Sequence, residues 1–168
     1  MPLPTSHDIL RKAEGTAVDS VVLSYDDRFL RRKVLTTEGG TGFLVDLAHT
    51  ESLDEGDAFV LTDGRCIAVV AAVEPLLEVT GAALHRIAWH IGNRHTPCQI
   101  DPDRLLIQRD HVIADMLSRI GATVREVDEP FTPEGGAYGH GRTHGHDHSH
   151  QHGPETHSHS HTHDHEHG

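Results

Sequence analysis

The chain has 168 residues and a formal net charge of −12, from 26 acidic and 14 basic side chains. This acidity, with no basic stripe, argues against binding to nucleic acid or to an anionic membrane. The only two cysteines, Cys66 and Cys98, do not form a CxxC pair, which argues against a disulfide framework and a zinc knuckle. No signal-peptide pattern opens the chain, and the longest apolar run, residues 66–73, is too short to span a bilayer. We therefore expect a soluble cytoplasmic protein.

The first half of the chain predicts a small, mostly antiparallel β domain over residues 1–73. Two hairpins are expected, one around the turn residues Gly39-Gly40 and one around Asp63-Gly64, which is the stronger turn signal between apolar runs. We place the domain boundary near Pro75. The predicted strands are residues 17–23, 31–37, 41–47, 58–62 and 65–72.

The second half changes its hydrophobic period and predicts a ferredoxin-like βαββαβ domain over residues 74–139, so the fold class is α+β. One helix is expected over residues 81–93. The other begins after Asp110 as N-cap and ends at Gly121. The expected apolar helix faces are Leu84, Ile87, Ala88 and Ile91, and Ile113, Met116, Leu117 and Ile120. The predicted strands are residues 76–80, 98–100, 105–107 and 123–127.

The last 29 residues, 140–168, carry 12 of the 18 histidines, mostly one residue apart. Neutral imidazole suits zinc, copper and nickel, and two such histidines on a flexible chain reach one ion without a preformed pocket. The intervening polar residues offer no apolar surface, so we expect a disordered metal-binding tail. A purification tag is the alternative, although a tag is normally an uninterrupted run. The expected tail ligands are His144, His146, His148, His150, His152, His157, His159, His161, His163, His165 and His167.

Two histidines outside the tail are further candidate metal ligands. His95 follows Gly92 and Asn93, which should end the first helix, so its imidazole is expected to point outward beside the tail. His111 follows Asp110, where the positive end of a helix disfavours a protonated imidazole and keeps the ring available as a ligand. For each, spacing alone leaves open the alternative of a surface histidine without a role.

The chain lacks the short signatures of several enzyme classes. No GxSxG, HExxH or phosphate-cradling glycine loop occurs, and we expect a protein without catalytic activity. Cys66 and Cys98 have apolar neighbours and are expected to be small buried side chains rather than ligands or nucleophiles. His85 lies four residues before Trp89 and is expected to pair with that ring on the domain surface.

Four strings occur in a fixed order along the chain: Gly-Asn-Arg-His at 92–95, Asp-His-Val at 110–112, Asp-Met-Leu at 115–117, and Phe-x-Pro-Glu-x-Gly-Ala-Tyr at 131–138. With the two expected domains and the His-rich tail, they resemble the UreE family of urease accessory proteins, which are nickel metallochaperones. The resemblance covers nearly the whole chain.

This resemblance implies a dimer, a site and partners. Family members form homodimers through the second domain, and the histidine matching His95 from each subunit meets its copy at the two-fold axis to hold one Ni²⁺. The first domain is implied to bind partners, and nickel passes, with the accessory GTPase, to apo-urease carrying its other accessory proteins. Some relatives carry a second histidine two positions before the match to His111, where this chain departs from the pattern with Arg109.

Exposed ligands and a flexible tail suit a carrier, whose site must fill and empty. Nickel takes about four to six N or O ligands, so the tail would hold on the order of two to four ions, and Zn²⁺ or Cu²⁺ would also bind. We therefore expect a nickel metallochaperone. The alternative is a His-rich nickel or zinc storage or buffering protein, in which the tail alone accounts for binding. A metal-dependent hydrolase is least favoured, because no set of fixed ligands with a base is evident.

Overall fold

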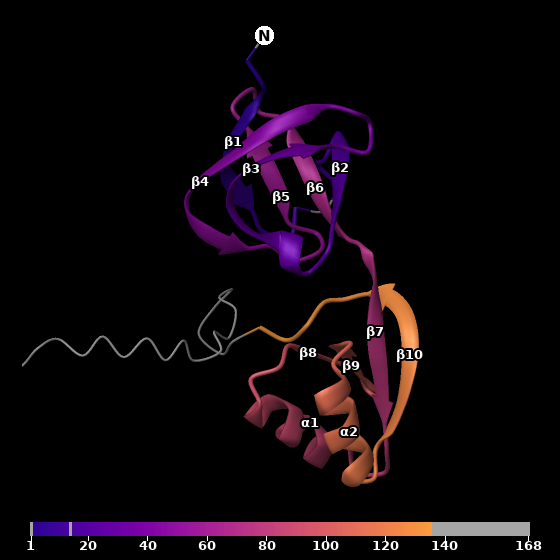
Figure 1. Cartoon of the computed structure of the whole chain (residues 1–168). Helices are drawn as coiled ribbons and strands as arrows, with labels where there is room; N and C mark the ends of the chain where they lie inside the picture. The colour runs from indigo at the N-terminus through magenta and orange to yellow at the C-terminus, as the bar shows by residue number, and fades with distance from the viewer. Residues whose placement is uncertain (1, 14, 136–168) are drawn as a thin grey trace, which may run out of the picture.

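The structure, a computed structural model, describes residues 2–13 and 15–135. This part of the chain is mostly β-sheet, with a β domain followed by an α+β domain that contains both α-helices (Figure 1). None of the described helices is long and apolar enough to cross a membrane. The predicted disordered tail and all of its histidines, residues 140–168, lie outside the described residues.

The first domain is one six-stranded sheet of order β2-β6-β5-β1-β4-β3. Both predicted hairpins are confirmed, since β3 pairs antiparallel with β4 and β5 pairs antiparallel with β6. The sheet is mixed, however, because β1 runs parallel to β4 and β2 runs parallel to β6. The elements are β1 (Thr5–Leu10), β2 (Asp19–Leu23), the 3-10 helix η1 (Asp26–Arg28), β3 (Phe29–Thr36), β4 (Gly42–Ser52), β5 (Ala58–Leu61) and β6 (Cys66–Ala71).

Alternation along these strands builds the core of the first domain. In β4, Phe43, Val45 and Leu47 are buried while the residues between them are partly exposed, as the two-residue period of a strand requires. Phe43 meets Phe59 of β5 with ring centroids 5.6 Å apart. The sheet therefore has one well-packed inner face.

The second domain is a four-stranded antiparallel sheet of order β10-β7-β9-β8. Its element order is the predicted βαββαβ order. One strand departs from expectation, since β7 runs through Pro75. Pro75 pairs with Asp128 of β10, whereas the pairing of β7 with β9 begins only at Leu76. The N–H that proline lacks is therefore not needed for the ladder between β7 and β9. The elements are β7 (Val73–Thr80), α1 (Leu84–Asn93), β8 (Cys98–Ile100), β9 (Leu105–Gln108), α2 (His111–Arg119) and β10 (Thr123–Pro130).

Different side chains pack against the two faces of this second sheet. Both helices lie on one face, as Figure 1 shows, and their buried residues Ile87, Ile91, Ile113 and Leu117 pack against β7 and β9. The predicted apolar helix faces are thereby confirmed at their centres. On the opposite face lies a smaller cluster, composed of Leu76, Leu106 and Phe131 with Tyr25 and Val127 against it.

A buried arginine holds the two domains together. The side chain of Arg28 is fully buried, and it donates to two backbone carbonyls of the first domain and to the carbonyl of Phe131 in the second. Tyr25 adds an edge-on ring contact with Phe131 at 5.4 Å, and its N–H donates to Glu74 at 2.8 Å. Because a guanidinium has several donors in a fixed plane, these bonds set the position of residue 131 relative to both sheets.

Candidate metal site

The backbone at His95 is left-handed and ends the turn that follows α1. Its φ is 56°, in a region that non-glycine residues seldom adopt, and its N–H donates to the carbonyl of Gly92 at 3.0 Å. The helix ends at Asn93, as predicted, although it begins at Leu84 rather than at residue 81. As predicted, the His95 side chain is exposed.

The electrostatics of this position favour a cation. The last carbonyls of a helix carry a partial negative charge, and His95 lies two residues beyond the last residue of α1. The helix has ten residues, enough for its peptide dipoles to add. An exposed imidazole at such an end is a suitable first ligand for a divalent ion.

His111 lies at the opposite kind of helix end. It is the first residue of α2 and is exposed. The predicted N-cap is confirmed, since the Asp110 carboxylate accepts from the N–H groups of Val112 at 2.9 Å and Ile113 at 3.2 Å. The partial positive charge of a helix N-terminus disfavours a dication beside His111.

Arg109, at the position where the resemblance implies a second histidine in some relatives, is held by the sheet. Its guanidinium donates to the carbonyls of Leu76 and Val127, both at 3.2 Å, and contacts the Asp128 carboxylate at 3.5 Å. A guanidinium stays protonated and offers no lone pair to a metal. Arg109 therefore joins α2 to β7 and β10 rather than completing a site with His111.

The described part of one chain does not gather a full ligand set. Within residues 2–13 and 15–135, no group of three or more His, Cys, Asp or Glu side chains is arranged to hold an ion. His95 and His111 lie at the ends of different helices, and the tail histidines fall outside these ranges. The assignment of His95, His111 and the tail residues as ligands stays a prediction.

Neither cysteine forms a disulfide, and both are half-buried rather than buried as predicted. Burial, together with repulsion of a thiolate by the nearby carboxylates of Glu134 and Asp101, raises the pKa of the Cys98 thiol to about 12. A protonated thiol is a poor metal ligand.

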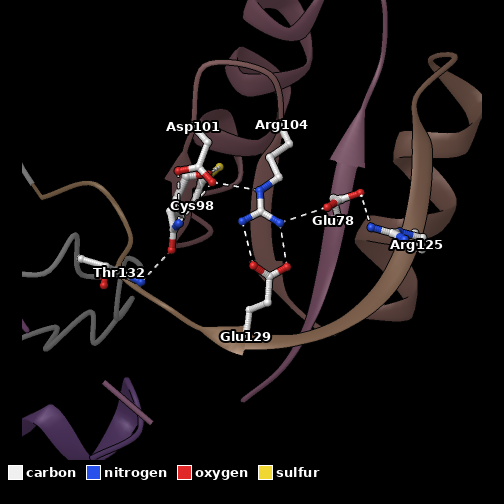
Figure 2. Close-up of polar contacts among 8 residues, drawn as sticks. Glu78, Cys98, Asp101, Arg104, Arg125, Glu129 and Thr132 are labelled. Carbon is white, nitrogen blue, oxygen red and sulfur yellow. Dashed lines mark hydrogen bonds and ion pairs between the residues drawn. The ribbon is translucent and has the colours of Figure 1, made fainter. Parts of the chain in front are cut away.

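Beside Cys98 lies a charge network that the sequence did not reveal (Figure 2). Arg104 donates to Glu129 at 2.6 and 2.8 Å, to Glu78 at 3.0 Å and to Asp101 at 3.0 Å, and Arg125 reaches the other side of Glu78 at 3.0 Å. Hydrogen bonds from Arg104 lower the pKa of Glu129, and the carboxylates raise that of Arg104. Pairing of β7 with β9 and β10 creates this network, so no single sequence window contains it.

The exposed side of α1 carries a hollow of about 350 Å³ lined by His85, Arg86, Trp89 and His90. Trp89 is 63% exposed and meets the ring of His90 edge-on, with centroids 5.0 Å apart. The structure thus gives Trp89 a different ring partner from the predicted His85. An exposed indole on the helix that leads to His95 offers apolar surface for a contact with another chain.

A second hollow, of about 280 Å³, brings together two histidines of the first domain. His7 and His49 lie on neighbouring strands, and His7 Nδ1 is 2.8 Å from the Asp46 carbonyl oxygen. No sequence pattern indicated this proximity, because it depends on the pairing of β1 with β4, which was not predicted. The remaining residues lining the hollow are Asp8, Ile9, Arg11, Leu47, Ala48 and Glu51.

Comparisons with known proteins agree over almost the whole chain. The family model described as UreE urease accessory protein, N-terminal domain, matches residues 3–72, and the corresponding C-terminal domain model matches residues 74–167. A "Urease accessory protein UreE" from Ruegeria pomeroyi is 70% identical over 145 residues, covering 86% of this chain and 97% of the relative. Proteins of the same description from Cereibacter sphaeroides and Paracoccus denitrificans are 61% and 57% identical, each over 84% of this chain and over 78% and 90% of the relatives.

Proposed function

This chain belongs to the UreE family of urease accessory proteins, which act in urease maturation, and we propose that it binds Ni²⁺ and delivers it to apo-urease. In this proposal the protein is a carrier in the cytoplasm rather than an enzyme. Nickel is its cargo, and Zn²⁺ or Cu²⁺ would occupy the same ligands.

The observation that carries the proposal is the placement of His95. Its imidazole is exposed, it follows a strained left-handed turn, and it lies at the negative end of α1. Such a position presents a ligand to solvent at a defined point while leaving most of the coordination shell open. A carrier needs that openness, because its ion must enter and leave.

We further propose that two copies of the chain share one ion. A single imidazole leaves a nickel shell incomplete, and a two-fold contact between second domains would place one His95 on each side of the axis. The exposed Trp89 on α1, the helix that precedes His95, supplies apolar surface near the proposed contact. His111 is a secondary candidate ligand, since its helix end favours anions rather than cations.

The tail histidines serve in this proposal as a reservoir that fills and empties the His95 site. Delivery then involves the accessory GTPase and apo-urease with its other accessory proteins, and the first domain is the proposed partner-binding module. The runner-up function is storage or buffering by the tail alone. The two functions differ in whether binding survives without the tail histidines.

Calorimetric titration with Ni²⁺ distinguishes the two functions. The sample is the full chain with every histidine from position 140 onward changed to Gln, which removes the tail ligands and keeps the length. The carrier proposal predicts one tight ion per two chains, and loss of that ion when His95→Ala is added. Absence of any tight ion in the tail variant would instead support storage. Activation of apo-urease by the nickel-loaded chain, compared with nickel salt alone, then tests delivery.

A further inference from the structure

The hollow of about 280 Å³ in the first domain is lined by residues of β1 and β4, two strands that pair in parallel (Figure 1). On its other side β1 pairs with β5, and there the register shifts between Ser6 and Asp8. His7 is therefore the extra residue of a β-bulge. A bulge turns a side chain in a direction that a regular strand does not allow, and bulges are over-represented beside functional sites.

The other strand, β4, is irregular at the same place. In its pairing with β3, Glu51 lies opposite Leu30 and Asp46 lies opposite Arg32. Residues 47–50 of β4 thus lie between the partners of two β3 residues that are only two positions apart. His49 belongs to this irregular segment and is exposed. The hollow therefore lies where two departures from regular pairing meet, and each contributes a histidine to its lining.

The ring of His7 is held in the orientation of a metal ligand. Its Nδ1 lies 2.8 Å from the carbonyl oxygen of Asp46. A carbonyl oxygen only accepts, so Nδ1 carries the hydrogen, and in the neutral ring Nε2 keeps its lone pair. Histidines that bind metals commonly donate their other ring N–H to a carbonyl or a carboxylate in this way. The fold thus leaves Nε2 of His7 as the nitrogen available to an ion.

His49 supplies a second imidazole from the opposite side of the strand pair. Zinc binds imidazole nitrogen at about 2.0–2.1 Å, so two nitrogens that share one ion are about 4 Å apart or less. A hollow of about 280 Å³ has room for an ion and its waters between the two rings. In the part of the chain that the structure describes, no group of three or more His, Cys, Asp or Glu side chains is arranged to hold an ion. Water therefore completes the shell of an ion bound here.

The charges around the hollow favour a cation. Asp8, Glu51 and Arg11 all line it. The Arg11 guanidinium donates to the buried carboxylate of Asp57 at 2.8 Å and to Glu51 at 3.1 Å. Three carboxylates thus accompany one guanidinium, which leaves an excess of negative charge. A phosphate or an acidic peptide would be repelled by this excess, whereas a divalent cation would be attracted.

We infer that His7 and His49 together bind one divalent transition-metal ion, at a site in the first domain that is separate from His95. Two imidazoles suit Zn²⁺, Ni²⁺ or Cu²⁺, whereas Mg²⁺ and Ca²⁺ prefer oxygen ligands. With two protein ligands in an exposed position, the site exchanges its ion readily. This inference goes beyond the proposed function and does not depend on it, because neither His95 nor the tail contributes a ligand.

The test uses Zn²⁺, which is diamagnetic, and long-range ¹H–¹⁵N NMR of the imidazole rings. The sample is the full chain with His95→Ala and with every histidine from position 140 onward changed to Gln, so that the proposed carrier site and the tail ligands are absent. Without metal, His7 should be the Nδ1–H tautomer. On titration, Nε2 of His7 and one ring nitrogen of His49 should shift together, with the same midpoint.

Single substitutions show whether the two rings share one ion. His7→Gln should raise the Zn²⁺ concentration at which His49 responds by at least about ten-fold, because one of two protein ligands is lost, and His49→Gln should do the same to His7. His111→Gln, which removes an exposed histidine of the second domain, is the matched control and should leave both responses unchanged. Unchanged amide shifts along β5 and β6 confirm in each variant that the first domain is folded.

Three results would overturn the inference. The rings would be independent surface histidines if they responded with different midpoints, or if His49 responded equally well in His7→Gln. Absence of a response at either ring with Zn²⁺ in large excess would exclude the site. An Nε2–H tautomer of metal-free His7 would remove its geometric basis. None of these results bears on nickel binding at His95, so failure of this inference and failure of the proposed function are distinguishable.

Discussion

The end of α1 and the start of α2 each present an exposed histidine, yet the two positions differ in almost every other respect. His95 follows a helix C-terminus in a left-handed backbone, and His111 occupies a regular first turn behind a capping aspartate. The N–H groups of Thr132 and Glu134 bind β8 at Gln99 and Cys98, a few residues after His95. The same residue type thus meets opposite local electric fields at the two helix ends.

This contrast teaches that exposure alone does not make a histidine a metal site. The peptide dipoles of a helix favour a cation at its C-terminus and an anion at its N-terminus, typically by a few tenths of a kcal/mol to about 1 kcal/mol. The difference between the two ends therefore favours His95 over His111 before any second ligand is counted. The predictions below separate the two ends by affinity and by stability.

The largest expected effect is on nickel affinity at the end of α1. In the chain with tail histidines changed to Gln, His95→Ala should weaken the tightest Ni²⁺ binding by at least about 100-fold, or about 2.7 kcal/mol, because the proposed site loses both of its imidazoles. Competition with a chromophoric chelator measures the change. Retention of tight binding would place the site elsewhere.

The next effect concerns stability at the start of α2. Asp110→Ala removes the carboxylate that accepts from two N–H groups of the first turn and should lower the free energy of unfolding by about 1 kcal/mol. Nickel affinity should not change. Urea unfolding followed by circular dichroism gives the first quantity, and the chelator competition gives the second. A parallel loss of affinity would show that this helix end takes part in the site.

A smaller effect is expected from the left-handed backbone at His95. Because glycine adopts a φ near 56° without a Cβ penalty, His95→Gly should be more stable to urea than His95→Ala by about 0.5–1 kcal/mol. Both variants lack the imidazole, so both should lose the ion equally. Equal stability of the two variants would mean that the turn relaxes away from this conformation.

The smallest effect is expected from His111→Ala. Removing an exposed first-turn imidazole should change the free energy of unfolding by less than about 0.5 kcal/mol and nickel affinity by less than about three-fold. The titration is the one used for His95→Ala, which serves as the positive control. A loss of nickel affinity comparable to that caused by His95→Ala would contradict the proposed difference between the two helix ends.

Much of the fold was predictable from local patterns. Asp-Gly at 63–64 and the i, i+3, i+4, i+7 spacing around Ile87 and Ile91 act over short stretches of chain, and both the hairpin and the helix are present. The capping role of Asp110 was equally local. The domain boundaries and the tail remain predictions.

What sequence reasoning missed depends on partners that are distant along the chain. β1 lacks a β-branched run, and its Ser6 is fully buried, so only its pairing with β4 and β5 makes it a strand. No sequence pattern singled out Arg28, although its side chain is buried between the domains. Residues 132–134 are a third case, because the pattern over residues 131–138 indicated a resemblance but not that Thr132 and Glu134 bind β8.

Some features of the candidate site were also predictable from local sequence, and others were not. Exposure of His95 followed from the end of a predicted helix, and the structure confirms it. Its left-handed backbone was not predictable, because Gly92 and Asn93 offered two residues better suited to that conformation and neither adopts it. The hydrogen bond from the Thr132 N–H to Gln99 was not predictable either, because it depends on where residue 132 lies in space.

The central claim is that one nickel ion is shared by His95 from two chains, and native mass spectrometry tests it most directly. The sample is the chain with tail histidines changed to Gln, mixed with Ni²⁺. The account predicts a dimer carrying one Ni²⁺, and a nickel-free species when His95→Ala is added. A monomer carrying one ion, or a dimer carrying two, would contradict it.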